Sequence, residues 1–112
     1  MDTNIILGIS NCIIGLLMLL LFIPLKKGLI KMNFVYGVRF QKSFESDELW
    51  YKINEFGANR FMKWSLLLFI IGIVAFFISF NNNIFLILIF ASAPLLVILP
   101  PTIETYLYAK QL

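Results

Sequence analysis

The chain has 112 residues, of which 61% are hydrophobic and 13% are charged, with a formal net charge of +3, one cysteine and no histidine. Soluble domains carry about 25% charged residues, so this composition excludes a disordered regulator and is typical of a small integral membrane protein. The missing histidine excludes His-rich zinc sites and triads built on histidine, and the lone Cys12 excludes a disulfide scaffold. We therefore expect no metal site and no cofactor.

Three long apolar runs, whose central parts carry no charge, are predicted to cross the bilayer. They cover about residues 4–25, 62–80 and 84–108, and about 20 mainly apolar residues are enough to span the hydrocarbon core. The runs are apolar on all sides, which favours lipid over the interior of a soluble bundle. No basic residue precedes the first run, so we expect a retained helix and not a secretory signal. The predicted fold class is an all-α integral membrane protein with three transmembrane helices in a single domain, residues 1–112.

The loop of residues 26–61 is expected to be structured, because it holds eight aromatic residues that need burial. Its second half is predicted to form a short amphipathic helix: Ser46 is a good N-cap, and Asp47 and Glu48 lie in the first turn. The apolar face of this helix either lies on the inner leaflet or packs on the spans. We favour packing on the spans, because the acidic residues of the segment weaken its attraction to anionic lipids.

The basic residues determine the expected orientation, since short loops rich in lysine and arginine remain cytoplasmic. Eight of the nine lie within residues 26–63, and none lies before the first run or in the turn of residues 81–83. We therefore expect the N-terminus outside, the loop and the C-terminus inside, and the three asparagines of the turn outside. The same topology explains the positive charge without a nucleic-acid partner.

Polar residues of the loop form the candidate site. The planar fork of Arg39 can hold a carboxylate, a phosphate or a peptide C-terminus through two hydrogen bonds, or it anchors the loop to headgroups. Glu104 lies near the inner interface, where an acid needs a partner, and we expect it to pair with Arg39 or Arg60. The three acids between residues 45 and 48 could hold a divalent ion, but helix capping explains them better.

The spacing of these residues follows a known pattern. A proline ends the first span, and an Asn-x-x-Tyr-Gly-Val-Arg box, a Ser-x-x-x-Trp step and an Asn-x-x-Gly step follow; the matching positions are Pro24, Asn33, Tyr36, Gly37, Arg39, Ser43, Ser46, Trp50, Asn54 and Gly57. The pattern resembles that of the SdpI family of bacterial membrane immunity proteins. Two departures are present: Phe40-Gln41 replaces the usual Thr-Pro after the arginine, and the typical member has further N-terminal spans. The chain resembles the C-terminal module of that family alone.

The resemblance implies a multi-pass protein of the bacterial cytoplasmic membrane that protects the cell against a secreted toxic peptide, by binding the peptide or masking its target. It also implies capture of a transcriptional repressor, a property tied to one operon. No catalytic residue is expected. The expected ligand- or toxin-binding residues are Asn33, Tyr36, Gly37, Arg39, Ser43, Trp50, Asn54, Gly57 and Glu104.

Two other functional classes remain open at this stage. The same cluster could serve a membrane enzyme or a small transporter, for which a homodimer would restore a six-span body. Small residues at positions 8, 15 and 72 could serve helix contact in such a dimer or packing within one chain. The third interpretation is a structural or assembly subunit. In that case, substitution of the polar residues of the loop would not change the phenotype of the cell.

Overall fold

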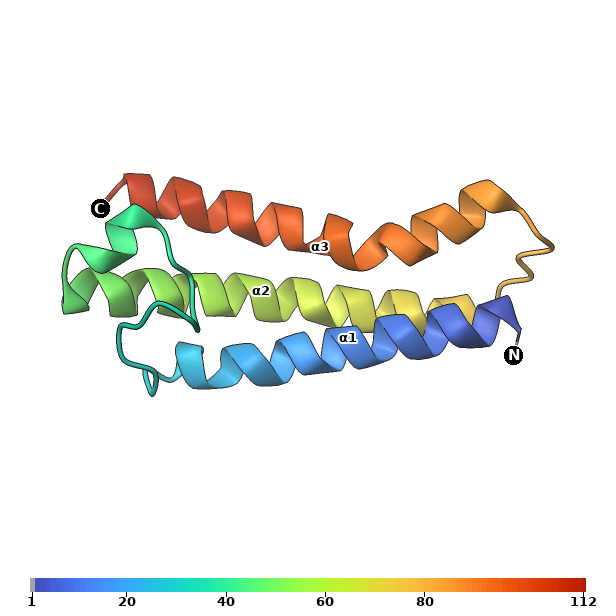
Figure 1. The fold of residues 1–112 in the computed structure, drawn as a ribbon, viewed down its shortest axis with the longest axis horizontal. Helices are drawn as coiled ribbons and strands as arrows, with labels where there is room; N and C mark the ends of the chain where they lie inside the picture. Colours follow the sequence, from blue (N-terminus) through green and yellow to red (C-terminus); the bar gives the residue numbers. More distant parts are fainter. Residues whose placement is uncertain (1) are drawn as a thin grey trace.

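Three long antiparallel helices lie side by side in the computed structural model, which describes residues 2–112 (Figure 1). They are α1 (Thr3–Lys26), α2 (Asp47–Phe76) and α3 (Ile84–Lys110), and a short 3-10 helix, η1 (Gln41–Phe44), lies between α1 and α2. The molecule measures 52 × 23 × 20 Å. Each long helix is long and apolar enough to cross a membrane, in agreement with the three predicted spans.

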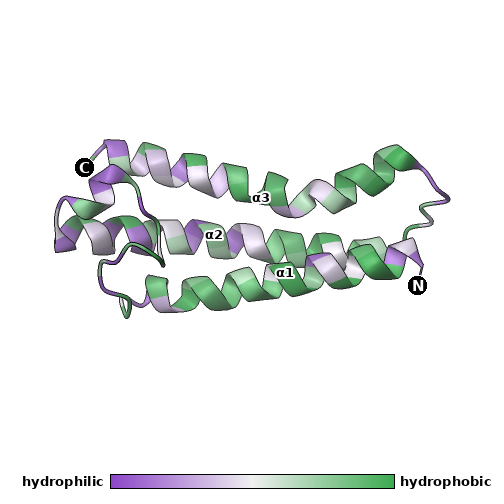
Figure 2. Cartoon of the chain, in the orientation of Figure 1, coloured by the Kyte–Doolittle hydropathy of each residue, from purple (hydrophilic) through white to green (hydrophobic). Residues whose placement is uncertain are grey.

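The polar and apolar parts of the chain separate along the bundle. Apolar residues cover most of the length of the helices, and hydrophilic residues gather at the end that holds the loop and the C-terminus (Figure 2). The opposite end holds the N-terminus and the connection between α2 and α3 (Figure 1). Many large apolar side chains face outward along all three helices, for example Leu21, Ile70 and Leu95. Such a surface suits lipid and not water.

The segment from Ser46 to the second span is one helix. The Oγ atom of Ser46 accepts a hydrogen bond from the Leu49 amide at 3.1 Å, so the predicted N-cap is present. The helix then continues for 30 residues to Phe76, a length of about 45 Å at 1.5 Å per residue. The predicted short helix inside a loop of residues 26–61 is therefore the first half of α2, and the connection is confined to residues 27–46. No proline interrupts this stretch, so nothing ends the helix where the span begins.

The connection between α2 and α3 is built by asparagines. Asn81 and Asn82 adopt positive φ angles of 47° and 59°, a left-handed conformation that asparagine tolerates better than most residues. Asn83 then caps α3, because its Oδ1 atom accepts from the amides of Phe85 and Leu86 at 3.1 and 3.3 Å. The turn expected at residues 81–83 is therefore present, within a connection that begins earlier, at Phe77.

A kinked third helix is fastened to α1 at the point where a proline interrupts it. Pro94 has no amide N–H, so the carbonyl of Phe90, four residues earlier, lacks its partner within the helix. The side chain of Asn11 supplies the missing donor: its Nδ2 atom donates to the Phe90 carbonyl at 3.0 Å and is almost completely buried. α3 bends in this region (Figure 1). Asn11 thus satisfies a backbone group that lipid could not satisfy.

Small residues bring α1 and α2 into close contact within one chain. A Cβ atom added at Gly72 would lie 2.6 Å from the backbone nitrogen of Cys12 and 2.9 Å from the carbonyl oxygen of Gly8. One added at Gly15 would lie 2.9 Å from backbone atoms of Ser65 and Phe69. The glycine positions that a dimer might have used are therefore occupied by intramolecular packing.

Replacing Gly72 by alanine is expected to push α1 and α2 apart, because two of the three nearest atoms that the new methyl group meets belong to the backbone and cannot rotate away; the third is the Cys12 sulfur. The net loss of stability should be about 1–3 kcal/mol, although alanine is the better helix former. Unfolding by SDS titration, followed by circular dichroism, measures the loss. Val74→Ala, on the exposed side of the same helix, is the control and should change stability little. Equal stability of the two variants would contradict the close packing.

Candidate functional site

The loop between α1 and α2 is folded by its own asparagine. The Oδ1 atom of Asn33 accepts hydrogen bonds from the amides of Val35 and Tyr36 at 2.9 and 2.6 Å, and its Nδ2 atom donates to the Tyr36 carbonyl at 3.0 Å. This is the local turn that an asparagine side chain forms with the residues after it. The hydroxyl of Tyr36 donates to the carbonyl of Leu21 and so ties the turn to the end of α1.

A second asparagine holds the loop against α2. The Oδ1 atom of Asn54 accepts from the Val38 amide at 2.6 Å, and its Nδ2 atom donates to the carbonyls of Val38 and Trp50 at 3.4 and 2.9 Å. The indole Nε1 of Trp50 donates to the Ile30 carbonyl at 2.9 Å. Both side chains are fully buried. They therefore supply hydrogen-bond partners to backbone groups of Ile30 and Val38, which lie in the irregular part of the loop.

Glycine is required at two places where the loop crosses α2. Gly37 has a φ angle of 130°, a conformation that other residues rarely adopt, and a Cβ atom there would lie 2.8 Å from both Asn54 Oδ1 and the Trp50 ring. A Cβ atom at Gly57 would lie 2.9 Å from the Val38 side chain and 3.1 Å from that of Thr105. These glycines let the loop, α2 and α3 approach closely. Arg39 lies two residues after Gly37 in the loop.

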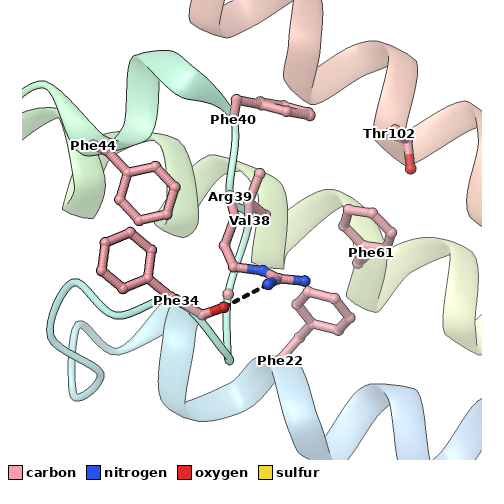
Figure 3. Close-up of a pocket in the computed structure, with 9 residues that line it drawn as sticks. Phe22, Phe34, Val38, Arg39, Phe40, Phe44, Phe61 and Thr102 are labelled. Atoms are coloured by element: carbon pink, nitrogen blue, oxygen red, sulfur yellow. Dashed lines mark hydrogen bonds between the residues drawn. The ribbon is translucent and has the colours of Figure 1, made fainter.

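Arg39 points into a cleft of about 540 Å³ at the loop end of the bundle (Figure 3). Its Nη1 atom donates to the Phe34 carbonyl at 2.5 Å. The cleft is bordered by α1, the loop, α2 and α3, and its walls are mainly aromatic; the lining residues are Phe22, Phe34, Gly37, Val38, Arg39, Phe40, Phe44, Phe61 and Thr102. The rings of Phe22 and Phe61 are stacked with centroids 4.6 Å apart. We call this feature the Arg39 cleft.

Glu104 is engaged elsewhere, in a contact between α2 and α3. Its Oε2 atom lies 3.1 Å from Arg60 Nη1, and its Oε1 atom accepts from the indole Nε1 of Trp64 at 2.8 Å. The Arg60 guanidinium also lies over the Phe56 ring, 5.0 Å from its centroid, and that ring stacks on Tyr108. Of the two pairs expected for Glu104, the structure forms the one with Arg60, and Arg39 remains in its cleft.

Replacing Glu104 by alanine is expected to destabilise the bundle by about 1–2 kcal/mol, because both Arg60 and Trp64 lose their acceptor at a half-buried position. Glu104→Gln retains an acceptor for the indole and should recover part of the loss. Glu48→Ala serves as the control, since Glu48 pairs with Lys52 at an exposed position and such pairs contribute little. SDS unfolding of the three variants tests this, and a loss in Glu104→Ala no larger than in Glu48→Ala would contradict it.

The expected site residues thus divide into two groups. Gly37 and Arg39 line the cleft. The side chains of Asn33, Trp50 and Asn54 instead form hydrogen bonds with the loop backbone. Ser43 is completely buried, and its hydroxyl has no hydrogen-bond partner among residues 2–112. The acids near the start of α2 are partly paired, Glu45 with Lys42 and Glu48 with Lys52. No group of acidic residues and cysteine that could hold a metal ion occurs in the described part of the chain.

Of the nine residues that line the cleft, the sequence predicted Gly37 and Arg39 as site residues and did not predict the other seven. Four of these seven belong to the loop: Phe34, Val38, Phe40 and Phe44. The other three are Phe22, Phe61 and Thr102. Each lies in or next to an apolar run, where phenylalanine is ordinary and threonine is unremarkable. Only the folding of the loop onto three helices brings them to Arg39, so periodicity alone holds no signal for them.

The sequence matches one known family. A family profile described as the SdpI/YfhL protein family matches residues 29–102, which is more than half of the chain. The chain belongs to the SdpI/YfhL protein family. The matched region of this SdpI/YfhL member contains nearly all of the loop, all of α2 and most of α3. It therefore includes every expected site residue except Glu104. The family suggested by the spacing of the loop residues is thereby confirmed. Neither a curated protein nor a solved structure matches the chain significantly.

Proposed function

We propose that this SdpI/YfhL protein is an immunity protein of the bacterial cytoplasmic membrane, which protects its cell against a secreted toxic peptide. Family membership and three membrane-spanning helices support a membrane protein of this kind. The protein acts by binding the peptide or by masking its target, and no chemical step is part of the proposal.

The Arg39 cleft is the observation that carries the proposal. Aromatic walls bind apolar side chains through a large contact area. A guanidinium pairs with a carboxylate or donates hydrogen bonds to the backbone carbonyls of a bound segment. A membrane-active peptide offers both kinds of group. A cleft of about 540 Å³ is large enough for a few side chains of such a peptide and lies within the usual range of ligand pockets.

The polar residues that surround the cleft act by positioning Arg39. Asn33 and Tyr36 fold the turn, and Trp50 and Asn54 fix the loop on α2. Gly37 and Gly57 allow the approach. On this proposal these six positions of the family pattern serve one purpose, namely a rigid loop that presents one guanidinium at the end of the bundle.

Expression of the chain in a sensitive bacterium tests the function. Cells that carry the protein and cells that carry an empty vector are challenged with the peptide product of the neighbouring gene, and the minimal inhibitory concentration is measured. We expect the protein to raise this concentration by at least about tenfold, as complete immunity requires. An unchanged concentration, with the protein present in the membrane fraction at normal levels, would refute the proposal.

A further inference from the structure

The Arg39 guanidinium has hydrogen-bond donors that the protein does not use. A guanidinium carries five N–H donors, and the structure gives one bond, from Nη1 to the Phe34 carbonyl. Arg39 forms no ion pair with any residue from 2 to 112. Arg60, the other arginine, is neutralised by Glu104. The charge of Arg39 is therefore free to meet an anion from outside the chain.

The guanidinium lies at the depth where the bilayer supplies such an anion. It points toward Phe22, which is one helical turn before Lys26, the last residue of α1 (Figure 3). One turn corresponds to about 5.4 Å along the helix. Of the side walls, Thr102 in α3 belongs to the third apolar run, and Phe61 in α2 directly precedes the second. A positive charge at this level is unfavourable without a partner, and phosphate is the anion of the headgroup layer beside it.

The cleft is also open to the side of the bundle. α3 packs on α2 and touches α1 much less, and the cleft is bordered by α1 on one side and α3 on the other, with Phe61 of α2 between them (Figure 3). The rings of Phe22, Phe40 and Phe61 form an apolar surface next to the guanidinium. An amphiphile can therefore place its anionic group on Arg39 and its chains against these rings and the neighbouring lipid.

We propose that the Arg39 cleft binds one anionic phospholipid of the leaflet at the basic end of the bundle, with the phosphate held by the Arg39 guanidinium. The fork of two parallel N–H groups matches two phosphate oxygens, which a lysine ammonium cannot reproduce. Charge complementarity and depth select this occupant. The proposal concerns the resting protein and does not depend on the immunity function, which requires a peptide in the same region.

Native mass spectrometry of the delipidated full chain in detergent tests the proposal. The protein is titrated with phosphatidylglycerol and, in parallel, with diacylglycerol of the same acyl chains, which lacks the phosphate. We expect one phosphatidylglycerol to bind per chain, about tenfold or more tighter than diacylglycerol, because charge-assisted hydrogen bonds of this kind are worth that factor. Equal affinity of the two lipids would overturn the proposal.

Substitutions locate the site. Arg39→Ala should bind phosphatidylglycerol no better than diacylglycerol, and Arg39→Lys should recover only part of the difference. Lys31→Ala removes the same charge from an exposed loop residue that does not line the cleft, and it should bind like the parent. Equal losses in Arg39→Ala and Lys31→Ala would indicate diffuse surface attraction and overturn the proposal. A short apolar peptide with a free carboxylate is titrated in parallel. If the parent protein binds this peptide through Arg39 but binds the two lipids equally, the proposal is also overturned.

Discussion

Replacing Arg39 by alanine is expected to abolish protection against the toxic peptide while the protein still inserts at normal levels. Among residues 2–112, the guanidinium is the one charged group that lines the cleft, and its bond to the Phe34 carbonyl is made at an exposed position. Loss of the side chain therefore removes the anion-binding group without breaking the core. The minimal inhibitory concentration of the challenge peptide should fall to within about twofold of the vector control, because a charge-assisted contact is worth tenfold or more.

Two comparisons separate the role of Arg39 from that of positive charge in general. Lys31→Ala removes one loop charge outside the cleft and should retain full protection. Arg39→Lys keeps the charge but loses the planar fork, so it should protect incompletely. Full protection by a well-expressed Arg39→Ala variant would show that the Arg39 cleft is not needed for immunity.

Replacing Asn54 by alanine is expected to detach the loop from α2. Asn54 is the partner of both the amide and the carbonyl of Val38, and a buried backbone group without a partner costs about 1–3 kcal/mol. The combined loss should be about 2–4 kcal/mol in the stability of the loop. The helices do not depend on these bonds, so circular dichroism should report the same helical content as the parent.

Limited trypsin digestion measures this local loss, because the loop contains Lys31, Arg39 and Lys42 as cleavage sites. We expect Asn54→Ala to be cut in the loop much faster than the parent, as local opening becomes more frequent. Asn59→Ala, on the same helix and without a side-chain hydrogen bond to the loop within residues 2–112, should be cut at the parental rate. Equal rates for all three proteins would show that the loop is held in another way.

The features of the fold that depend on neighbouring residues in the sequence could be predicted. Charge-free apolar runs predicted the three helices, Ser46 predicted the start of α2, and the asparagines predicted the turn before α3. The continuity of α2 was not predicted, because its first half is amphipathic and polar whereas its second half is apolar, and a change of composition was interpreted as a change of element. The hydrogen bonds of the helix backbone continue across this boundary, because they do not require the side chains on either side of it to be alike.

The candidate site shows the opposite limit. The sequence identified Asn33, Trp50 and Asn54 as important, and the structure uses all three to satisfy loop backbone, as with Asn54 and Val38, 16 residues apart. A polar residue in a membrane protein can serve a ligand or an unpaired backbone group equally well, and only geometry distinguishes the two. Likewise, Glu104 needed a partner on grounds of depth, but the choice of Arg60 over Arg39 depended on how α3 packs against α2.

Photo-crosslinking from the cleft tests the central claim most directly. A photoreactive phenylalanine analogue is placed at position 61, which lines the Arg39 cleft, and in a second protein at position 70, which faces outward from the same helix. Cells that express either protein are exposed to the toxic peptide and irradiated. We expect crosslinks to the peptide from position 61 and few from position 70. Equal crosslinking from the two positions, or none from position 61 in cells that remain protected, would contradict the assignment of the cleft as the site of peptide binding.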